Sequence, residues 1–424
     1  MNGGLRIRPD RLQERLKTLG AFGRNERGGL DRTTFTPSEL MARHWLREEC
    51  RALGLEVRVD AAANIWARRP GTDPALPVVA LGSHIDTVPN GGMYDGALGV
   101  IIALEIMSVL EDRGVDTRHP LELVSFSAEE PNPFGLSTFG SRAAAGKLST
   151  PDLAGVCDSN GQLLADALRL AGGDAERLGL AKRDPQELAA FLEVHIEQGK
   201  RMLERSVPVG IVTSITGIYR EEVTVYGQPN HAGTTLMKDR SDALAAASEM
   251  ILALESVCRN HPSDETVGTA GRIFTEPNAA NIIPGKATFT LEVRGKSGTE
   301  IREVTGMWQE RMKKMLQSRQ VHVERRVLLD QAPQPMDAAI IKLFKETADH
   351  LGYDTMQLGS MAGHDAVHLA TITKAGMLFV PSIGGKSHCP EEESRIEDIE
   401  KAAEIMLHTI LALDRPDKPK GETG

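Results

Sequence analysis

The sequence predicts an α/β protein: a mostly parallel sheet covered by helices, with a smaller two-layer domain inserted into it. Short apolar runs that end in polar, glycine-rich turns alternate with helical patterns, which is the order typical of parallel sheets. The middle of the chain departs from this alternation and follows the order β-α-β-β-α-β, which is typical of a split βαβ sandwich. The length of 424 residues accommodates both parts.

Four apolar runs are predicted to be strands of the parallel sheet. They are Pro77–Leu81, Leu121–Phe126, Phe191–Val194 and Met377–Val380. The helical patterns of this domain are Pro37–Leu53, Gly96–Leu110, Ile340–Leu351 and Glu397–Leu413. Ligands of open α/β sheets bind outside the carboxyl ends of the strands, so the polar segments after these runs are the first candidates for a site.

The inserted domain is expected to span residues 214–331, with residues 1–213 and 332–424 forming one discontinuous domain around it. Its predicted elements are strand Glu221–Tyr226, helix Ser241–Cys258, strands Thr266–Phe274 and Lys286–Val293, helix Gly298–Gln317 and strand Val321–Leu328. The segment Ala332–Met336, with two prolines, is interpreted as a linker. The polar tail Asp414–Gly424 is expected to fray.

Composition excludes several classes of function. The 59 acidic and 49 basic side chains give a net charge of -10, which argues against a nucleic-acid partner because such binding depends on basic side chains. The most apolar stretch, Ala97–Leu110, contains Glu105 and is too short to cross a bilayer. The N-terminal residues have no apolar signal-peptide core. A cytoplasmic protein with no membrane partner is therefore expected.

The four cysteines lie far apart in the sequence. They are Cys50, Cys157, Cys258 and Cys389. With no C-x-x-C pair, this spacing indicates reduced thiols rather than disulfides or a cysteine zinc site.

The strongest signal for chemistry is the segment 82–99, G-S-H-I-D-T-V-P-N-G-G-M-Y-D-G-A-L-G. His84 and Asp86 follow a predicted strand, and residues two apart on an extended segment share a face. Asp95 opens the next helix after a glycine turn. This spacing directs an imidazole and carboxylates toward one end of the predicted sheet.

Further candidates are associated with other strands. Glu129 and Glu130 occur in S-A-E-E, His195 in E-V-H-I-E-Q-G, and His388 in G-G-K-S-H. Imidazole and carboxylate ligands without thiolate suit Zn, Mn, Co or Ni, and four or five of them exceed one tetrahedral site. The three histidines, with Glu130 and the aspartate Asp95, would hold two ions if one carboxylate bridged them.

Adjacent glutamates beside a metal allow a division of labour. One binds the ion, and the other takes the proton from metal-bound water. Asp86 is placed to accept the second ring N–H of His84. Each pattern alone has a simpler explanation: loop polarity for H-x-D, a solvated face for E-E, and a surface position for a lone histidine. Their joint placement after strands of one sheet favours a site.

These motifs, together with N-H-A-G-T-T, A-G-H-D-A and the stretch Asn281–Arg294, make the chain resemble the zinc-dependent hydantoinase/carbamoylase amidohydrolases. The resemblance extends from about Arg8 to Leu413. That family includes N-carbamoyl-L-amino-acid hydrolases, β-ureidopropionases and allantoate amidohydrolases. It is related to dinuclear metallopeptidases such as the aminoacylases and bacterial carboxypeptidases.

The resemblance implies two divalent ions per subunit, zinc first, with Mn, Co or Ni as alternatives. His84, Asp95 and His195 match the first-metal and bridging positions, with Asp95 as the bridge. Glu130 and His388 complete the second ion. Glu129 matches the general base, and Asp86 matches the carboxylate that orients an imidazole.

The resemblance also implies a homodimer through the inserted domain, which closes over the site. Family members place an imidazole of the partner's small domain over the substrate, and its match is His231; without the resemblance, a loop histidine capping a turn is the simpler interpretation. Arg294 offers a planar fork for a substrate carboxylate, or is simply a surface arginine at a strand end. The resemblance further implies that Asn281 binds the carboxylate side of the substrate together with Arg294, and that Gln198 contacts the substrate.

The loop A-G-H-D-A matches a segment whose main chain lines the pocket. Ala362 and Gly363 are the substrate-binding candidates there, whereas His364 and Asp365 could simply stabilise the loop.

Three departures from the family pattern lie in loops expected near the pocket. Met361 replaces a glycine, Leu236 stands where proline is common, and Pro131-Asn-Pro follows the second glutamate. They leave the metal chemistry intact but leave the choice of substrate open.

The expected function is hydrolysis of the carbamoyl C–N bond of an N-carbamoyl amino acid to amino acid, CO2 and NH3. The nucleophile would be a hydroxide that bridges the two metals, with Glu129 as its base. The partner is a small carbamoyl or ureido substrate that bears a carboxylate. Alternatives are allantoate or 3-ureidopropionate as substrate, cleavage of an N-acyl or peptide bond, and a non-enzymatic metal-dependent binding protein.

Overall fold

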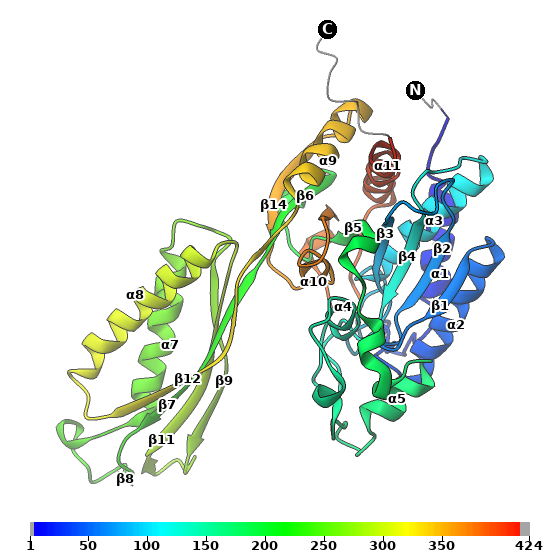
Figure 1. The fold of residues 1–424 in the computed structure, drawn as a ribbon. Helices are drawn as coiled ribbons and strands as arrows, with labels where there is room; N and C mark the ends of the chain where they lie inside the picture. The colour runs from blue at the N-terminus through cyan, green and yellow to red at the C-terminus, as the bar shows by residue number, and fades with distance from the viewer. Residues whose placement is uncertain (1–3, 416–424) are drawn as a thin grey trace. The chain divides into compact units, whose positions relative to one another are not determined.

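The computed structural model of the chain describes residues 4–415, which form two compact units (Figure 1). Of the described residues, the first unit comprises residues 4–213, the segment Met336–Leu358 and residues 364–415. The second unit comprises Ser214–Pro335 and the short segment Gly359–Gly363.

A sheet of nine strands is the centre of the first unit, although its short edge strand β13 belongs to the second, and the middle of this sheet is parallel. Hydrogen-bonded neighbours follow the order β1-β2-β4-β3-β5-β15-β6-β13, and β14 pairs with β6. β4, β3, β5 and β15 run parallel to one another, whereas the outer pairings are antiparallel. The predicted mostly parallel sheet is confirmed. The strands are β1 (Glu56–Val59), β2 (Ile65–Arg69), β3 (Val78–His84), β4 (Leu121–Phe126), β5 (Leu188–Ile196), β6 (Val209–Ile215), β13 (Gln334–Pro335), β14 (Thr355–Ser360) and β15 (Ala375–Val380).

Helices cover both faces of this sheet (Figure 1). On one face α1, α2, α3, α9 and α11 bury their apolar side chains in one continuous core with the strands. On the other face α4 packs against β4, α10 packs against β5 and β15, and α4 and α5 share a second apolar cluster. The helices are α1 (Pro9–Leu19), α2 (Pro37–Ala52), α3 (Ala97–Asp112), α4 (Phe139–Ala144), α5 (Leu164–Leu170), α6 (Arg201–Glu204), α9 (Ala338–Leu351), α10 (Ala366–Leu369) and α11 (Ile396–Leu413).

The central helix α3 lies in the core and is buried on all sides along most of its length. Every residue from Ala97 to Leu110 is buried. Its carboxylate Glu105 is held by two arginines of α1, with Nε of Arg11 at 2.6 Å and Nη1 of Arg15 at 3.3 Å. This pairing offsets the cost of burying the charge of Glu105 within the core. In the described part of the chain, no helix is long and apolar enough to cross a membrane.

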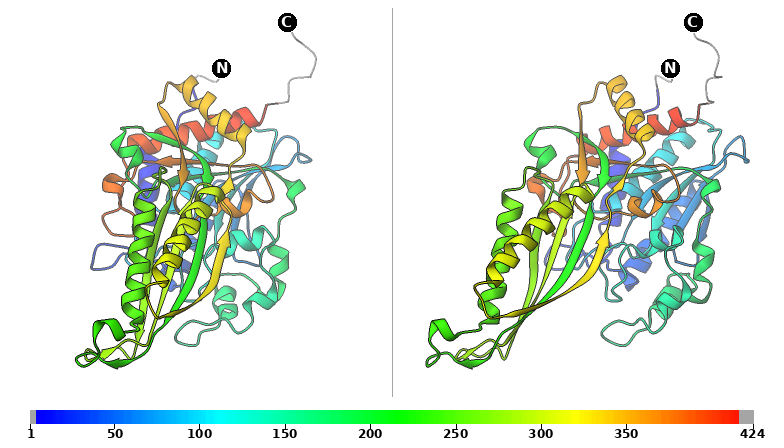
Figure 2. Two further views of the ribbon diagram at one scale, coloured as in Figure 1. Left: turned by 90° about the vertical axis from the view of Figure 1, so that its left-hand side faces the viewer. Right: turned by 60° about the vertical axis from the view of Figure 1, so that its left-hand side comes forward.

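The second unit is a two-layer sandwich in the predicted order β-α-β-β-α-β. Its antiparallel sheet has the order β12-β7-β11-β9, and both helices lie on one face of it (Figure 2). Alternate residues of β11 (Ala287, Phe289, Leu291 and Val293) are buried under those helices, as the period of two in a half-buried strand requires. The elements are β7 (Gly217–Tyr226), β8 (Asn230–His231), α7 (Ala243–Arg259), β9 (Val267–Glu276), β10 (Ile282–Ile283), β11 (Lys286–Gly295), α8 (Gly298–Leu316) and β12 (His322–Gln331).

Two strands that carry predicted ligand residues, β3 and β5, are longer than the sequence predicts. β3 continues through His84, and β5 continues through Ile196. His84 and His195 therefore lie within strands and not in the loops after them. The apolar run of β3 ends earlier, at Leu81, but the main chain of Ser83 still pairs with β4. Side-chain polarity alone does not reveal such pairing.

The segment Ala332–Met336, interpreted as a linker, contains strand residues. Gln334 and Pro335 pair with Ile215 and Ser214 at the end of β6. Proline fits here because β13 lies at the edge of the sheet. The two ends of the long segment of the second unit are therefore paired neighbours.

The cysteines and the first residue of the C-terminal tail are well defined in the structure. All four cysteines are free thiols, as predicted. The tail is expected to fray from Asp414 onward, but the carboxylate of Asp414 accepts hydrogen bonds from the main-chain N–H groups of Arg118 and His119. Residues 416–424 lie outside the described residues.

Candidate metal centre

The structure brings the five ligand candidates together at the carboxyl ends of the parallel strands. His84 is the last residue of β3, and His195 lies near the end of β5. Asp95 lies just before α3, Glu130 follows β4, and His388 lies in the loop between β15 and α11. Parallel strands end at the same edge of a sheet, so residues far apart in the chain meet there.

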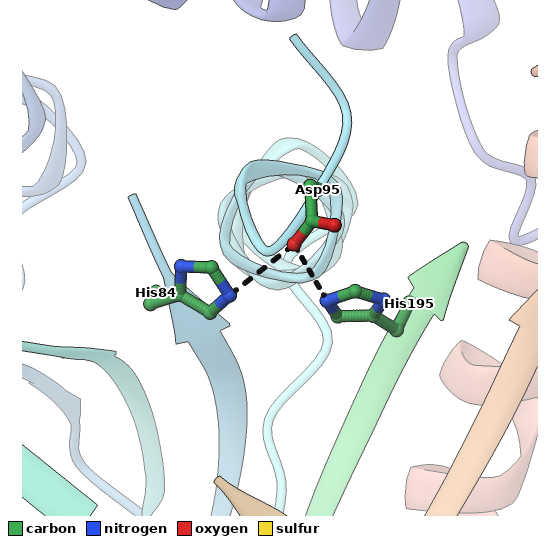
Figure 3. A group of neighbouring side chains, drawn as sticks. All are labelled: His84, Asp95 and His195. Atoms are coloured by element: carbon green, nitrogen blue, oxygen red, sulfur yellow. Dashed lines mark ion pairs between the residues drawn. The ribbon is translucent and has the colours of Figure 1, made fainter. Parts of the chain in front are cut away.

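The first group of candidates consists of His84, Asp95 and His195, all buried (Figure 3). Nε2 of His84 lies 3.5 Å and Nε2 of His195 lies 3.2 Å from Oδ1 of Asp95. Nδ1 of His84 lies 3.1 Å from the main-chain O of Asp86, and Nδ1 of His195 lies 3.0 Å from that of Ile196. A carbonyl only accepts, so Nδ1 of each ring carries hydrogen and Nε2 faces the group as a ligand atom.

Carboxylates lie close enough to these imidazoles to favour a positive charge. Burial lowers the pKa of His84, but the carboxylates, Glu129 first, outweigh burial and hold the pKa well above its ordinary value. Burial raises the pKa of Asp95, but His195 and the other imidazoles hold it well below its ordinary range. A cation among these groups would supply the same positive charge, so the donor set fits a divalent ion.

The second group consists of Asp95, Glu130 and His388. Nε2 of His388 lies 3.3 Å from Oε1 of Glu130 and 3.5 Å from Oδ2 of Asp95. These carboxylates, Asp95 first, raise the pKa of His388 to about 11. Oε1 of Glu130 is buried and lacks a well-directed hydrogen bond from any described residue. A cation bound by this oxygen would satisfy it.

Asp95 belongs to both groups and offers one oxygen to each. Its Oδ1 faces His84 and His195, and its Oδ2 faces His388. Oδ2 also accepts hydrogen bonds from Nε2 of Gln198 at 2.7 Å and from the hydroxyl of Ser387 at 2.8 Å. This geometry suits a carboxylate that bridges two ions.

The backbone around the groups is bent at several positions. Gly96 has φ 62°, and a Cβ there would lie 2.2 Å from Nε2 of His84, so the approach of the ring requires glycine. Ala128, Gln198 and His388 also have positive φ, at 52°, 58° and 58°. Such conformations cost about 1–2 kcal/mol per non-glycine residue and concentrate at functional sites.

Glu129 lies beside the first group without belonging to either. Its Oε2 is 3.7 Å from Nε2 of His84. Burial and the neighbouring Glu130 raise its pKa well above the ordinary range, although His84 opposes them. A carboxyl group with a raised pKa next to candidate ligands has the properties of a general base.

The carboxylate of Asp86 lies beside its predicted partner, the ring of His84, and has further partners. The ring nitrogen Nδ1 of His84 lies nearer to the main-chain O of Asp86 than to its Oδ1, at 3.1 and 3.6 Å. Oδ1 accepts the main-chain N–H of Glu129 at 3.3 Å, and Oδ2 accepts that of Glu130 at 3.2 Å. Oδ2 also accepts the hydroxyl of Thr34 at 2.8 Å. Strand β3 has ended, so the main chain of Asp86 is free to turn its carbonyl toward the ring.

The loop A-G-H-D-A packs against the first group through His364. His364 packs edge-on against His195, with ring centroids 4.5 Å apart. The main-chain N–H of Ala366 donates to Oε2 of Glu193 at 3.0 Å, which ties α10 to β5. These contacts favour the interpretation that His364 stabilises the loop.

Three supporting side chains were not predicted. Thr34, Ser387 and Glu392 all bond to the candidate residues or to their main chain. Ser387 is part of the G-G-K-S-H motif, which is a weak signal. The other two belong to no motif.

His231 and Asn281 are neighbours within the second unit. β8 and β10 pair so that His231 lies opposite Ile282, and the N–H of Ala232 donates to the carbonyl of Asn281 at 3.0 Å. The main-chain N–H of Gly233 donates to Nδ1 of His231 at 3.0 Å, and the imidazole is exposed. This contact is the turn-capping one that the simpler interpretation expects.

Arg294 lies at the other end of β11 from His231 and Asn281. The span from Lys286 to Arg294 along the strand is roughly 27 Å at the usual rise per residue. Nε of Arg294 donates to Oε1 of Glu292 at 2.6 Å. Within one chain, the structure therefore does not bring Arg294 together with His231.

The loop after β14 carries the remaining substrate candidates. Nη1 of Arg294 donates to the carbonyl of Met361 at 3.3 Å, so the residue that departs from the family pattern contacts Arg294 through its main chain. Ala362 follows, and its N–H donates to the hydroxyl of Ser360 at 3.2 Å. A Cβ at Gly363 would meet no atom within 4 Å, so this position is open.

Two further segments differ from the family pattern, and one of them contacts a ligand candidate. Nδ2 of Asn132, between Pro131 and Pro133, donates to the carbonyl of Glu130 at 3.0 Å. Leu236 is exposed in the second unit.

Comparison with known proteins gives consistent matches over most of the chain. Residues 80–412 match the family described as peptidase family M20/M25/M40. The chain is 38% identical to an N-carbamoyl-L-amino acid amidohydrolase of Geobacillus stearothermophilus over 96% of this chain and 99% of that protein. It is 32% identical to the allantoate amidohydrolase of Escherichia coli (strain K12), over 95% and 97% of the two chains. A hydantoinase/carbamoylase family amidase from Burkholderia ambifaria has a similar structure, with a TM-score of 0.88, 31% identity and coverage of 97% and 98%. The resemblance predicted from the motifs is confirmed.

Proposed function

The chain belongs to peptidase family M20/M25/M40, and on that premise we propose that it hydrolyses the carbamoyl C–N bond of an N-carbamoyl amino acid. The products are the amino acid, CO2 and NH3. The observation that carries the proposal is the shared position of Asp95 between two ligand groups, with the carboxylate of Glu129, a member of neither group, beside them. The similarity to an N-carbamoyl-L-amino acid amidohydrolase over nearly the whole chain supports this substrate class.

Two divalent ions per subunit are proposed, zinc first, with Mn, Co or Ni as alternatives. The first ion would be held by His84, Asp95 and His195, and the second by Asp95, Glu130 and His388. When bound, such ions supply Lewis acidity, which polarises a carbonyl and makes water a nucleophile at neutral pH. The buried Oε1 of Glu130, which lacks a well-directed hydrogen bond from the described residues, supports this assignment.

Glu129 is proposed as the general base. Its Oε2 takes the proton from the attacking water and returns it to the leaving nitrogen of the carbamoyl group. Its raised pKa suits both steps, because a carboxylate that holds a proton more readily than an ordinary glutamate also returns it to nitrogen. Asp86 fixes the main chain of the same turn through the N–H of Glu129.

Gln198, Arg294 and Asn281 are proposed to bind the rest of the substrate. Oε1 of Gln198 is buried and accepts no hydrogen bond from the described residues, so it is free to accept a ureido N–H. Arg294 is half-buried and oriented by Glu292 and Met361, which leaves part of its fork for a carboxylate.

The main chain of Ala362 and Gly363 is proposed to line the same pocket. The open surroundings of Gly363 leave room for a substrate there.

A homodimer through the second unit is proposed to complete each site. His231 and Asn281 lie at one end of β11 and Arg294 at the other, so one chain does not present them to the same small molecule. A second copy of the chain would supply His231 and Asn281 to a site that keeps its own Arg294. The exposed imidazole would then stabilise the charge that develops on the carbonyl oxygen.

A substrate panel tests the function. N-carbamoyl-L-amino acids, their D-enantiomers, allantoate, 3-ureidopropionate and N-acetyl amino acids would be assayed with Zn²⁺ and with Mn²⁺, and metal content would be measured. The fastest turnover is expected on an N-carbamoyl-L-amino acid, with two ions per chain. Faster turnover of allantoate or of 3-ureidopropionate would transfer the proposal to that substrate. Fewer than one ion per chain with no hydrolysis would favour a non-enzymatic binding protein.

A further inference from the structure

We infer that Glu392 is a positioning residue that holds the second ligand group in place. The inference rests on the proposed function, because it concerns the second of the two proposed ions. Glu392 lies in a run of three glutamates before α11, and it is the buried member of that run, at 6% exposure. Its neighbours Glu391 and Glu393 are exposed.

The carboxylate of Glu392 joins two distant segments of the chain. Oε1 accepts the main-chain N–H groups of Tyr94 at 2.8 Å and of Asp95 at 3.0 Å. Oε2 accepts the hydroxyl of Ser387 at 3.0 Å and the main-chain N–H of His388 at 3.3 Å. One side chain therefore fixes the main chain of two candidate ligands, Asp95 and His388.

A glycine makes room for this carboxylate. A Cβ at Gly92 would lie 2.2 Å from Oε1 of Glu392 and 2.3 Å from its carboxyl carbon. Gly92 and Glu392 thus form a matched pair, in which the turn before Asp95 leaves space that the glutamate fills.

Ser387 couples Glu392 to the bridging candidate. Its hydroxyl lies 2.8 Å from Oδ2 of Asp95 and 3.0 Å from Oε2 of Glu392. The hydroxyl has one hydrogen to donate, so the position of one carboxylate affects the bond to the other. Removal of Glu392 frees the hydroxyl and the Asp95 main chain together.

The second group depends on Glu392 more than the first group does. His84 and His195 are held in strands β3 and β5. His388 lies in a loop with a left-handed backbone, and its side chain is 45% exposed. Its main-chain N–H is bound by Glu392, so the loss of this carboxylate releases the weakest-held ligand.

Zinc titration of two variants tests the inference. Wild-type protein is expected to bind two Zn²⁺ ions in isothermal titration calorimetry. Glu392→Ala should bind one ion with near-wild-type affinity and the other about 10–100-fold more weakly, as is typical when a residue supporting a metal ligand is lost. The affinity of Glu392→Gln for this ion should lie between those of wild type and Glu392→Ala. Its amide oxygen still accepts the N–H groups of Tyr94 and Asp95, but its NH2 group faces the main-chain N–H of His388, which needs an acceptor. The kcat should fall with little change in KM.

Glu404→Gln is the matched control. Glu404 is also a buried carboxylate of the first unit, but it bonds to Arg6 and Tyr353 and not to the ligand groups. It should keep both ions, and thermal unfolding in chelator should show that all variants fold.

Equal weakening of both ions in Glu392→Ala, or the same loss in Glu404→Gln, would overturn the positioning role. Two ions of wild-type affinity in Glu392→Ala would overturn the inference while the proposed function stands. A wild-type protein with fewer than two ions would overturn the proposed function and this inference with it.

Discussion

The carboxylate of Asp86 holds the main chain of Glu129, with Oδ1 3.3 Å from its N–H. The other oxygen accepts the N–H of Glu130 and the hydroxyl of Thr34. Asp86 therefore acts on the turn that carries both glutamates, while its main-chain carbonyl faces Nδ1 of His84. One residue links the strand that bears a ligand candidate to the turn that bears the candidate base.

Asp86→Asn is expected to lower kcat by about 10–100-fold, because an amide presents NH2 where a main-chain N–H needs an acceptor. Steady-state kinetics on the best panel substrate checks this. Thr34→Val removes one hydrogen bond to the same carboxylate and should have a smaller effect. A kcat equal to that of wild type in Asp86→Asn would show that the turn does not need this carboxylate.

Glu129→Gln is expected to lose turnover by about 10²–10⁴-fold, which is the usual contribution of a general base. The variant should still bind two ions, because Glu129 belongs to neither ligand group. Kinetics with metal analysis on the same sample separate the two properties. The exposed Glu187→Gln is the control for an amide at a glutamate position. Near-wild-type turnover in Glu129→Gln would refute its role as base.

Gly96→Ala and Gly114→Ala form a matched pair of substitutions. Both glycines have positive φ, so alanine strains the backbone in both variants by at least about 1 kcal/mol. At Gly114 nothing lies within 4 Å of the added Cβ, whereas at Gly96 it meets the ring of His84 at 2.2 Å. Gly96→Ala should therefore lose affinity for the first ion, and Gly114→Ala should not. Equal zinc affinities in calorimetry would contradict the geometry.

Asp365 should make the free energy of unfolding fall as pH rises. Burial, with the Glu193 carboxylate next, raises the pKa of Asp365 to about 8. Because an unfolded aspartate ionises near 3.9, the folded state retains a proton that the unfolded chain releases. The stability from this group is complete below about pH 4 and is lost as pH rises through about 8.

Asp365→Asn should remove this dependence. In urea denaturation with chelator present, wild type should lose stability relative to the variant between about pH 5 and about pH 8. A difference between the two proteins that stays constant over this range would show that Asp365 ionises normally.

Mixed dimers test whether the subunits share sites. Glu129→Gln lacks the proposed base but retains His231, and His231→Ala lacks the imidazole but retains Glu129. If each site takes His231 from the other copy, a one-to-one mixture refolded together should regain about a quarter of wild-type activity, because half the dimers are mixed and each has one complete site. No gain above the separate variants would mean that the imidazole acts within its own chain.

Three of the ligand candidates could be predicted because each lies close to the end of an apolar strand. Once the strands are parallel, topology alone brings His84, Glu130 and His195 to one edge. Glu392 and Thr34 could not be predicted in this way. They act by accepting main-chain N–H groups or by donating a hydroxyl, and neither kind of contact requires a sequence pattern. A run of three glutamates before a helix is normally solvated, so burial of the middle one became evident only in the structure.

The order of strands and helices in the second unit was predictable, but the way its two chain ends pair with each other was not. Period-two and helical patterns in β11 and α8 are clear, because one face of each element is buried. The pairing of Gln334 and Pro335 with β6 was not predictable, because two residues carry no periodicity and proline usually indicates a break.

The pairing of Ile215 with Gln334 has a consequence for the order in which the chain folds. The second unit has its own apolar core, so its folding can bring these two residues together before the large sheet is complete. Without that pairing, the contact of Ile211 in β6 with Leu378 in β15 closes a loop of roughly 170 residues, and with it the effective loop falls to roughly 50 residues. Each doubling of loop length costs roughly 0.6 kcal/mol of closure entropy, so this shortening saves roughly 1 kcal/mol. Early folding of the insert would thus speed the docking of β6 onto β15 by reducing its entropic barrier.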